Sequence, residues 1–148
     1  MRCTFFGHRD APDSIKNSIR LAITTLVKEN NVKIFYVGNN GNFDFIVQSV
    51  LEEMVKKEGG FEYFIVLSTP NEKACFGRQD NTIFPEGLES ALPKFSISKR
   101  NEWMIKNCGF VITYVRNSRT NAYKWAKKAE RKGARVINLF DESSGVLD

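Results

Sequence analysis

Four short segments concentrate the side chains that could bind a phosphorylated ligand: Gly7–Arg9, Gly38–Asp44, Ser98–Asn101 and Arg116–Asn121. Together they supply backbone N–H groups, arginines, asparagine amides and a carboxylate. A guanidinium fork matches a phosphate group, and an acidic side chain can accept hydrogen bonds from ribose hydroxyls. The candidate ligand-binding residues are therefore Gly7, His8, Arg9, Gly38, Asn39, Gly41, Asn42, Asp44, Ser98, Arg100, Asn101, Ser118, Arg119, Thr120 and Asn121.

Each candidate also has a purely structural explanation, and the sequence leaves both open. His8 is either a ligand-binding residue or an exposed loop residue. Arg9 either binds phosphate or pairs with Asp10 or Asp13. Asp44 either contacts the ligand or only stabilises the positive end of a helix dipole.

The turn Gly38–Gly41 could cradle an anion. It joins an apolar run of β type, Phe35–Val37, to a helical ladder of apolar residues that begins at Phe43. We expect Asn42 to be the N-cap of this helix, whose unpaired N–H groups could bind an anion. The turn matches neither a Walker loop nor the three-glycine dinucleotide fingerprint. An anion site and a tight turn without a ligand remain equally good interpretations.

The composition is that of one globular domain spanning residues 1–148, with a net charge of +5. No apolar run is long enough to span a membrane, and the N-terminus does not resemble a signal peptide. The three cysteines lack C-x-x-C spacing, so we expect reduced thiols in a cytoplasmic protein, with Cys3 and Cys108 buried. With a single histidine in the chain, we expect no metal site, and we expect no cofactor.

Much of the positive charge lies near the C-terminus, in and just after one helical segment. A basic helix face could follow a nucleic-acid backbone, but a solvated face is the commoner cause of such a pattern. We therefore expect a solvated face, with nucleic acid as the less favoured partner. The basic residues of this segment are Lys124, Lys127, Lys128, Arg131, Lys132 and Arg135.

Continuous apolar runs alternate with helical ladders, which is typical of a parallel sheet covered by helices on both faces. We expect a Rossmann-like three-layer α/β sandwich with five strands in the order 3-2-1-4-5. Ligands should bind at the carboxyl ends of strands one and four, where the order reverses. Trp103 and Trp125 are expected in the core. The predicted strands are Arg2–Phe6, Val32–Val37, Tyr63–Leu67, Phe110–Val115 and Val136–Leu139, and the predicted helices begin near Pro12, Asn42, Ser98 and Asn121.

The segment Ser68–Ile97 has no sustained periodicity and contains three prolines and two glycines. Long loops inside compact domains are often lids, so we expect a lid over the ligand site, with a short helical turn around Glu86–Leu92. The tail Asp141–Asp148 is expected to be frayed.

The chain resembles the SLOG superfamily, a Rossmann-like group that includes the LOG phosphoribohydrolases and the Smf-type DNA-processing proteins. The resemblance is closest to small bacterial SLOG-domain proteins and runs from Cys3 to Leu139. It implies a Rossmann-like fold and a nucleotide-derived ligand at the strand ends. The motifs are FFGHRD (5–10), YVGNNGNFD (36–44), TIFPEGLE (82–89), ISKRNEWM (97–104) and ERKGARVINL (130–139).

One departure from the LOG pattern decides the expected function. LOG enzymes carry PGGxGTxxE after the fourth strand, where the glycines hold phosphate and the glutamate assists glycosidic cleavage. Here residues 117–122 read NSRTNA, and the first carboxylate of the following helix is Glu130. Glycosidic cleavage needs a carboxylate at the reacting sugar. We therefore expect binding or sensing of a nucleotide-type small molecule rather than catalysis.

Two other functions stay open. The first is a nucleotide-processing enzyme with a relocated carboxylate, for which Arg100, Glu86 and Asp44 are the catalytic candidates and Arg100 matches the LOG arginine. Asp80 could supply the carboxylate in the same way if the long loop folds over the site. The second is binding of single-stranded nucleic acid by the basic helix. The sequence does not decide between a monomer and a homodimer.

Overall fold

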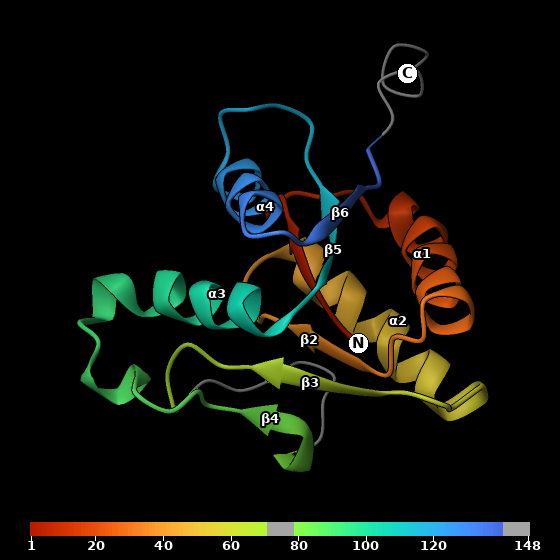
Figure 1. The fold of residues 1–148 in the computed structure, drawn as a ribbon, viewed down its shortest axis with the longest axis horizontal. Coiled ribbons are helices and arrows are strands. Elements are labelled where there is room, and N and C mark those ends of the chain that lie inside the picture. The colour runs from red at the N-terminus through yellow and green to blue at the C-terminus, as the bar shows by residue number, and fades with distance from the viewer. Residues whose placement is uncertain (71–78, 141–148) are drawn as a thin grey trace.

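The computed structural model describes residues 1–70 and 79–140. Its centre is a six-stranded parallel sheet with the order β4-β3-β2-β1-β5-β6 (Figure 1). The order reverses between β1 and β5, which are direct neighbours. The strands are β1 (Arg2–Gly7), β2 (Ile34–Val37), β3 (Glu62–Val66), β4 (Thr82–Ile83), β5 (Phe110–Tyr114) and β6 (Arg135–Asn138).

The expected Rossmann-like sandwich and the order of its five long strands are confirmed, but the strand count is wrong. The missed strand is β4, which lies at the edge of the sheet inside the segment expected to be a long loop. It pairs with β3 over only two residues, Thr82 and Ile83. Two residues are too few to show the alternation that identifies a strand in a sequence.

Helices cover both faces of the sheet (Figure 1). The helices α1 and α2 pack on one face with Phe5 and Phe35, whereas α3 and α4 pack on the other with Phe6. Phe5 and Phe6 serve opposite faces because successive side chains of a strand alternate. The helices are α1 (Lys16–Glu29), α2 (Asn42–Lys57), α3 (Ser96–Asn107) and α4 (Asn121–Arg131), with short 3-10 turns η1 (Asp13–Ile15), η2 (Gln79–Asn81), η3 (Leu88–Ser90) and η4 (Pro93–Phe95).

The apolar ladder of α2 is buried as expected, but Asn42 is not its N-cap. Gly41 takes that position, and the Asn42 side chain instead donates hydrogen bonds to the Ala11 carbonyl at 2.6 Å and to Asp13 Oδ1 at 3.1 Å. Asn42 therefore fastens the start of α2 to the β1–α1 loop. An N-cap side chain would accept a backbone N–H through its oxygen, whereas both of these bonds are donated by the Asn42 Nδ2 group.

The start of α3 also differs from the prediction. The helix begins at Ser96, directly after η4 and two residues before the predicted start, so Ser98 lies inside its first turn. Pro93 occupies the first position of η4, and its fixed φ angle suits the start of a helical turn. The expected short helical turn at Glu86–Leu92 is present as η3.

The segment Ser68–Ile97 is not one long irregular loop in its described part. Residues 79–97 form η2, β4, η3, η4 and the start of α3. Leu67 donates a backbone hydrogen bond to Ile83 at 2.8 Å, which ties β4 to the end of β3. Residues 71–78 of the expected lid and the expected frayed tail lie outside the described residues.

The cysteines Cys3 and Cys108 are buried free thiols, as expected. Burial raises the pKa of Cys3 well above its usual range and that of Cys108 to about 12. Both thiols are therefore protonated and unreactive near neutral pH. Cys75 lies outside the described residues. Within residues 1–70 and 79–140, each helix is too short or too polar to cross a lipid bilayer.

Candidate functional site

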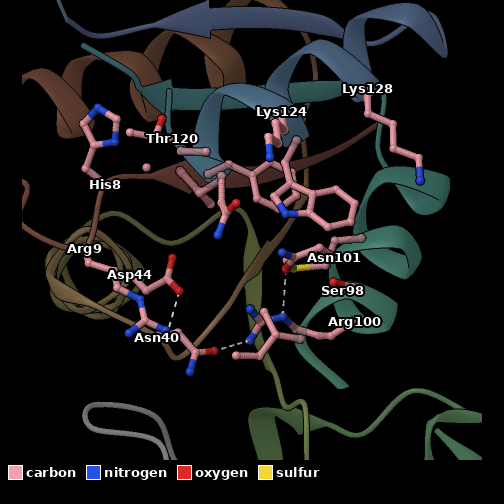
Figure 2. Close-up of a pocket in the computed structure, with 18 of the residues that line it drawn as sticks. His8, Arg9, Asn40, Asp44, Ser98, Arg100, Asn101, Thr120, Lys124 and Lys128 are labelled. Carbon is pink, nitrogen blue, oxygen red and sulfur yellow. Dashed lines mark hydrogen bonds between the residues drawn. The ribbon is translucent and has the colours of Figure 1, made fainter. Parts of the chain in front are cut away.

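A cleft of about 1060 Å³ opens at the carboxyl ends of β1 and β5, where the strand order reverses. This is the edge at which doubly wound sheets bind their ligands. The start of α2 forms one wall, the first half of α3 a second, and α4 with its preceding loop the third (Figure 2). Residues from all four segments singled out in the sequence therefore meet at one place.

The turn after β2 is held together by its own side chains. Gln48 Nε2 donates to both the Gly38 carbonyl and Asn39 Oδ1 at 2.9 Å, and Asp44 Oδ2 accepts the Asn40 amide at 2.9 Å. A Cβ at Gly38 would lie 2.8 Å from Asp44 Oδ2 and 3.1 Å from the Arg100 guanidinium. A glycine is therefore required at position 38, because a larger residue would clash with the Asp44 and Arg100 side chains.

The other glycine of the turn, Gly41, is required by the neighbouring loop. Its φ of 92° and ψ of 172° are accessible almost only to glycine, and a Cβ there would lie 2.9 Å from Arg9 Cα. The Asn42 amide at the start of α2 donates to the Arg9 carbonyl at 2.8 Å. An amide that could have met an anion is therefore already bonded, and the geometry favours a tight turn.

Arg100 braces three elements from inside the cleft wall. It is only 3% exposed. Its Nε donates to Asn101 Oδ1 at 3.1 Å, and its Nη1 donates to Asn40 Oδ1 at 2.8 Å (Figure 2). Nη1 also donates to the Val66 carbonyl at 3.4 Å. The guanidinium thereby joins α3 to the β2–α2 turn and to the end of β3. Because these bonds use several of its donors, the Arg100 guanidinium is less able to bind a phosphate than the guanidinium of an exposed arginine.

His8 is buried at the bottom of the β1–α1 loop and is 5% exposed. Its Nε2 accepts the Arg116 amide at 2.7 Å, and its ring meets the Tyr114 ring edge to face. Burial and the nearby Arg116 guanidinium lower the His8 pKa, although Asp10 acts in the opposite direction. His8 is therefore neutral near pH 7 and binds the loop that follows β5.

The loop after β5 and the helix α4 form a basic wall. Thr120 caps α4, with Oγ1 accepting the Tyr123 amide at 3.3 Å, and the buried face of the helix is the alanine line Ala122, Ala126 and Ala129. The opposite side presents basic residues to the cleft, where Lys128 also pairs with Glu102 of α3 at 3.4 Å. The basic residues of this wall are Arg116, Arg119, Lys124, Lys128 and Arg131.

Two carboxylates line the cleft among the described residues, and both have partners. Asp10 pairs with Arg116 at 2.7 Å on the exposed rim, and that hydrogen bond is the main cause of its lowered pKa. Asp44 is buried beside Arg100. Against these two stand eight arginines and lysines that line the same cleft. The cleft is therefore strongly electropositive and suits an anion.

The structure brings most of the predicted site residues together. Ten line the cleft: Gly7, His8, Arg9, Asp44, Ser98, Arg100, Asn101, Arg119, Thr120 and Asn121.

The other five predicted site residues do not line the cleft: Gly38, Asn39, Gly41, Asn42 and Ser118. The catalytic candidate Glu86 and the carboxylate Asp80 are exposed and also lie outside it.

Sequence reasoning misses several residues that line the cleft. It predicts a solvated face for Lys124, Lys128 and Arg131, although their spacing of four and three residues places them on one side of a helix. Trp125 is expected in the core, but it is only partly buried and stacks on Phe6 with ring centroids 6.2 Å apart. Asn40 and Arg116 lie in segments that the sequence singles out, although neither is among the candidate residues. Further cleft residues outside the candidate set are Phe5, Phe6, Asp10, Lys94, Ile97, Met104 and Ala122.

The described residues contain no group of three or more histidine, cysteine, aspartate or glutamate side chains arranged to hold a metal ion. No family model matches the chain, and no curated protein matches it.

A solved structure does match: the X-ray structure of DNA processing protein A (DprA) from Streptococcus pneumoniae, with a TM-score of 0.64 and 18% sequence identity. The match covers 91% of this chain and 48% of that one, so the chain spans about half the length of this neighbour. At this level of identity the likeness establishes the fold. The chain shares the Rossmann-like architecture of this DNA-processing protein.

Proposed function

We propose that the chain binds a nucleotide or a nucleotide-derived ligand in the cleft at the carboxyl ends of β1 and β5. The observation that carries the proposal is the charge of the cleft, in which eight arginines and lysines face two carboxylates that already have partners. The resemblance to SLOG domains and the fold shared with a DNA-processing protein both support a ligand of this class.

The phosphate would bind at the rim formed by Arg9, Arg119 and Lys124. These three side chains are exposed and line the cleft, so they can reach a phosphate without giving up a buried bond. Charge-assisted bonds from guanidinium and ammonium groups are the strongest phosphate contacts that a protein makes. Asp44, at the inner end, would accept hydrogen bonds from the sugar hydroxyls.

Thermal unfolding tests this proposal against several bases in parallel. The protein is heated with a panel of adenine and guanine mono- and dinucleotides, with inorganic phosphate and sulfate as controls. A ligand at about 100 times its Kd stabilises the folded state by about 2.7 kcal/mol, which raises the Tm by roughly 5–10 °C for a chain of this size. If no nucleotide of the panel raises the Tm more than sulfate does, the ligand is not an adenine or guanine nucleotide.

A second candidate function is binding of single-stranded nucleic acid. The specific observation is that Lys124, Lys128 and Arg131 follow one side of α4 along the cleft, with Trp125 between them. A helix rises 1.5 Å per residue, so these three cations span about 10 Å, more than one phosphate can contact. The DNA-processing neighbour also supports this candidate.

Fluorescence anisotropy with a labelled oligothymidylate at several salt concentrations separates the two candidates. Each neutralised phosphate of a single strand contributes about −0.7 to the slope of log K against log salt. If the α4 cations bind the backbone, Lys124→Gln and Arg131→Gln should each reduce the slope by about that amount. Lys57→Gln, an exposed lysine outside the cleft at the end of α2, is the matched control and should leave the slope unchanged.

A further inference from the structure

The β5–α4 loop, residues 115–120, is held at its start by a few specific bonds. The Asn138 side chain of β6 accepts a hydrogen bond from the Val115 backbone amide and donates one to the Val115 carbonyl, both at 3.0 Å. The next residue, Arg116, is bonded through its amide to His8 Nε2 at 2.7 Å and through its guanidinium to Asp10 at 2.7 Å. His8 and Asp10 therefore hold the point from which the loop crosses to α4.

This loop carries part of the proposed anion site. Arg116, Arg119 and Thr120 all line the cleft, and Arg119 and Thr120 follow the His8 contact by only three and four residues. A change in the path of the chain at Arg116 would move these groups with it. The loop must keep its present path for the basic wall to face the ligand.

The contact fixes the protonation state of His8. Because Nε2 accepts the amide N–H of Arg116, it carries no proton, and the neutral ring has its hydrogen on Nδ1. A proton on Nε2 would turn the acceptor into a donor that faces another donor. The N–H of Arg116 would then lose its acceptor beside an imidazole that is itself only 5% exposed.

The charged groups around His8 do not remove this conflict. The Arg116 guanidinium disfavours a second positive charge, and the Asp10 carboxylate, which acts in the opposite direction, is itself exposed and paired with that guanidinium. Tyr114 presents only its ring. Arg9, next in the chain, is a further cation, and Asp44 lies across the cleft in the wall formed by α2.

We propose that His8 is a positioning residue whose neutral Nε2 holds the β5–α4 loop in its anion-binding path, so that protonation of His8 releases the loop and weakens anion binding. The ligand half of this inference rests on the function proposed above. The proposed effect of protonation on anion affinity is opposite to the effect of charge alone, because a new positive charge in an anion site should strengthen binding.

The first arm of the test uses the protein without any ligand. Amide protection of Arg116 is followed by NMR from about pH 8 to about pH 5, together with the His8 ring signals. The protection should fall as His8 titrates, by about tenfold for the loss of one good hydrogen bond. In His8→Gln, whose Oε1 can accept the same N–H and does not titrate, protection should be independent of pH. If the Arg116 amide stays protected while His8 of the wild-type protein titrates, the proposal is wrong. The wild-type protein alone is enough to give this result.

The second arm measures anion binding with sulfate. Sulfate keeps its charge over this range, whereas a phosphate monoester titrates near pH 6 and would confuse the result. The wild-type affinity should fall about tenfold on acidification, and that of His8→Gln should not fall. An affinity that rises or stays constant in the wild type while Arg116 loses protection overturns the link between the loop and the site. Absence of sulfate binding at every pH would instead count against the proposed function, and the first arm would still decide whether His8 holds the loop.

Discussion

Arg100 Nη1 donates a 2.8 Å hydrogen bond to Oδ1 of Asn40, which joins the wall formed by α3 to the turn that opens α2 (Figure 2). The two residues are 60 positions apart in the sequence, and both line the cleft. Arg100 is a candidate phosphate-binding residue, and this bond shows that it stabilises the walls of the binding site. The exposed cations of the rim are left as the groups that would meet the ligand.

Removing this brace should destabilise the protein. Arg100→Ala leaves the Asn40 side chain and the Val66 carbonyl without a charged donor, at a cost of about 1.5–3 kcal/mol in the free energy of unfolding. Urea unfolding measures the change. Lys99→Ala, an exposed neighbour on the same helix, is the control and should change stability by less than about 0.5 kcal/mol. An Arg100→Ala protein of normal stability that no longer binds nucleotide would restore Arg100 as a direct ligand.

Gly41 should resist substitution for a reason that does not involve the ligand. Gly41→Ala forces a Cβ into a backbone region open almost only to glycine and against Arg9 Cα, which costs about 1–3 kcal/mol. Gly109→Ala is the matched control, because a Cβ there would meet nothing within 4 Å and its φ is not positive. Thermal unfolding of the two variants is the measurement. Equal stability combined with weaker nucleotide binding in Gly41→Ala alone would favour the anion cradle after all.

The stability of the protein should fall on mild acidification because of His8. Its pKa in the folded protein lies below the usual 6.5, so the unfolded chain takes up a proton more readily. Stability is therefore complete above pH 6.5 and decreases as the pH falls from there toward the folded pKa. Asp10, whose pKa is lowered from 3.8, contributes only at more acidic pH. Urea unfolding across this range should show the decrease in the wild type and a flatter profile in His8→Gln, and parallel profiles would contradict the prediction.

The protein should not release free base from nucleoside monophosphates. The first turn of α4 contains no acidic residue, and both cleft carboxylates are already bonded to the protein. Loss of a positioned acid or base typically lowers a rate by about 10²–10⁴-fold. Chromatography after incubation with adenosine and guanosine monophosphates should detect no base above a heat-treated control. Base release that Asp44→Asn abolishes would identify a relocated carboxylate and an enzyme.

Local sequence patterns are sufficient to predict the architecture apart from the short edge strand β4. The apolar runs at β1, β2, β3, β5 and β6 and the helical ladders between them indicate the parallel sheet and its reversal point. That reversal point alone locates the cleft, because ligands bind where the strand order changes.

What could not be predicted depends on contacts between residues that are distant in the sequence. The role of Arg100 depends on Asn40 and Val66, and that of His8 depends on an amide 108 residues away. Gly7 is required because a Cβ there would lie 2.3 Å from the Phe43 ring, which no local pattern reveals. The basic side of α4 is visible in the sequence, but its placement in the cleft depends on the alanine face that packs against the sheet.

Isothermal titration calorimetry of charge-matched variants tests the central claim most directly. The nucleotide that gives the largest thermal shift is titrated into the wild type, Arg119→Gln, Lys124→Gln and Lys28→Gln. Lys28 is an exposed lysine near the end of α1, outside the cleft. Saturable binding that weakens about tenfold in each cleft variant and is unchanged in Lys28→Gln is the predicted result. Equal affinity in all four proteins would contradict the assignment of the cleft as the nucleotide site.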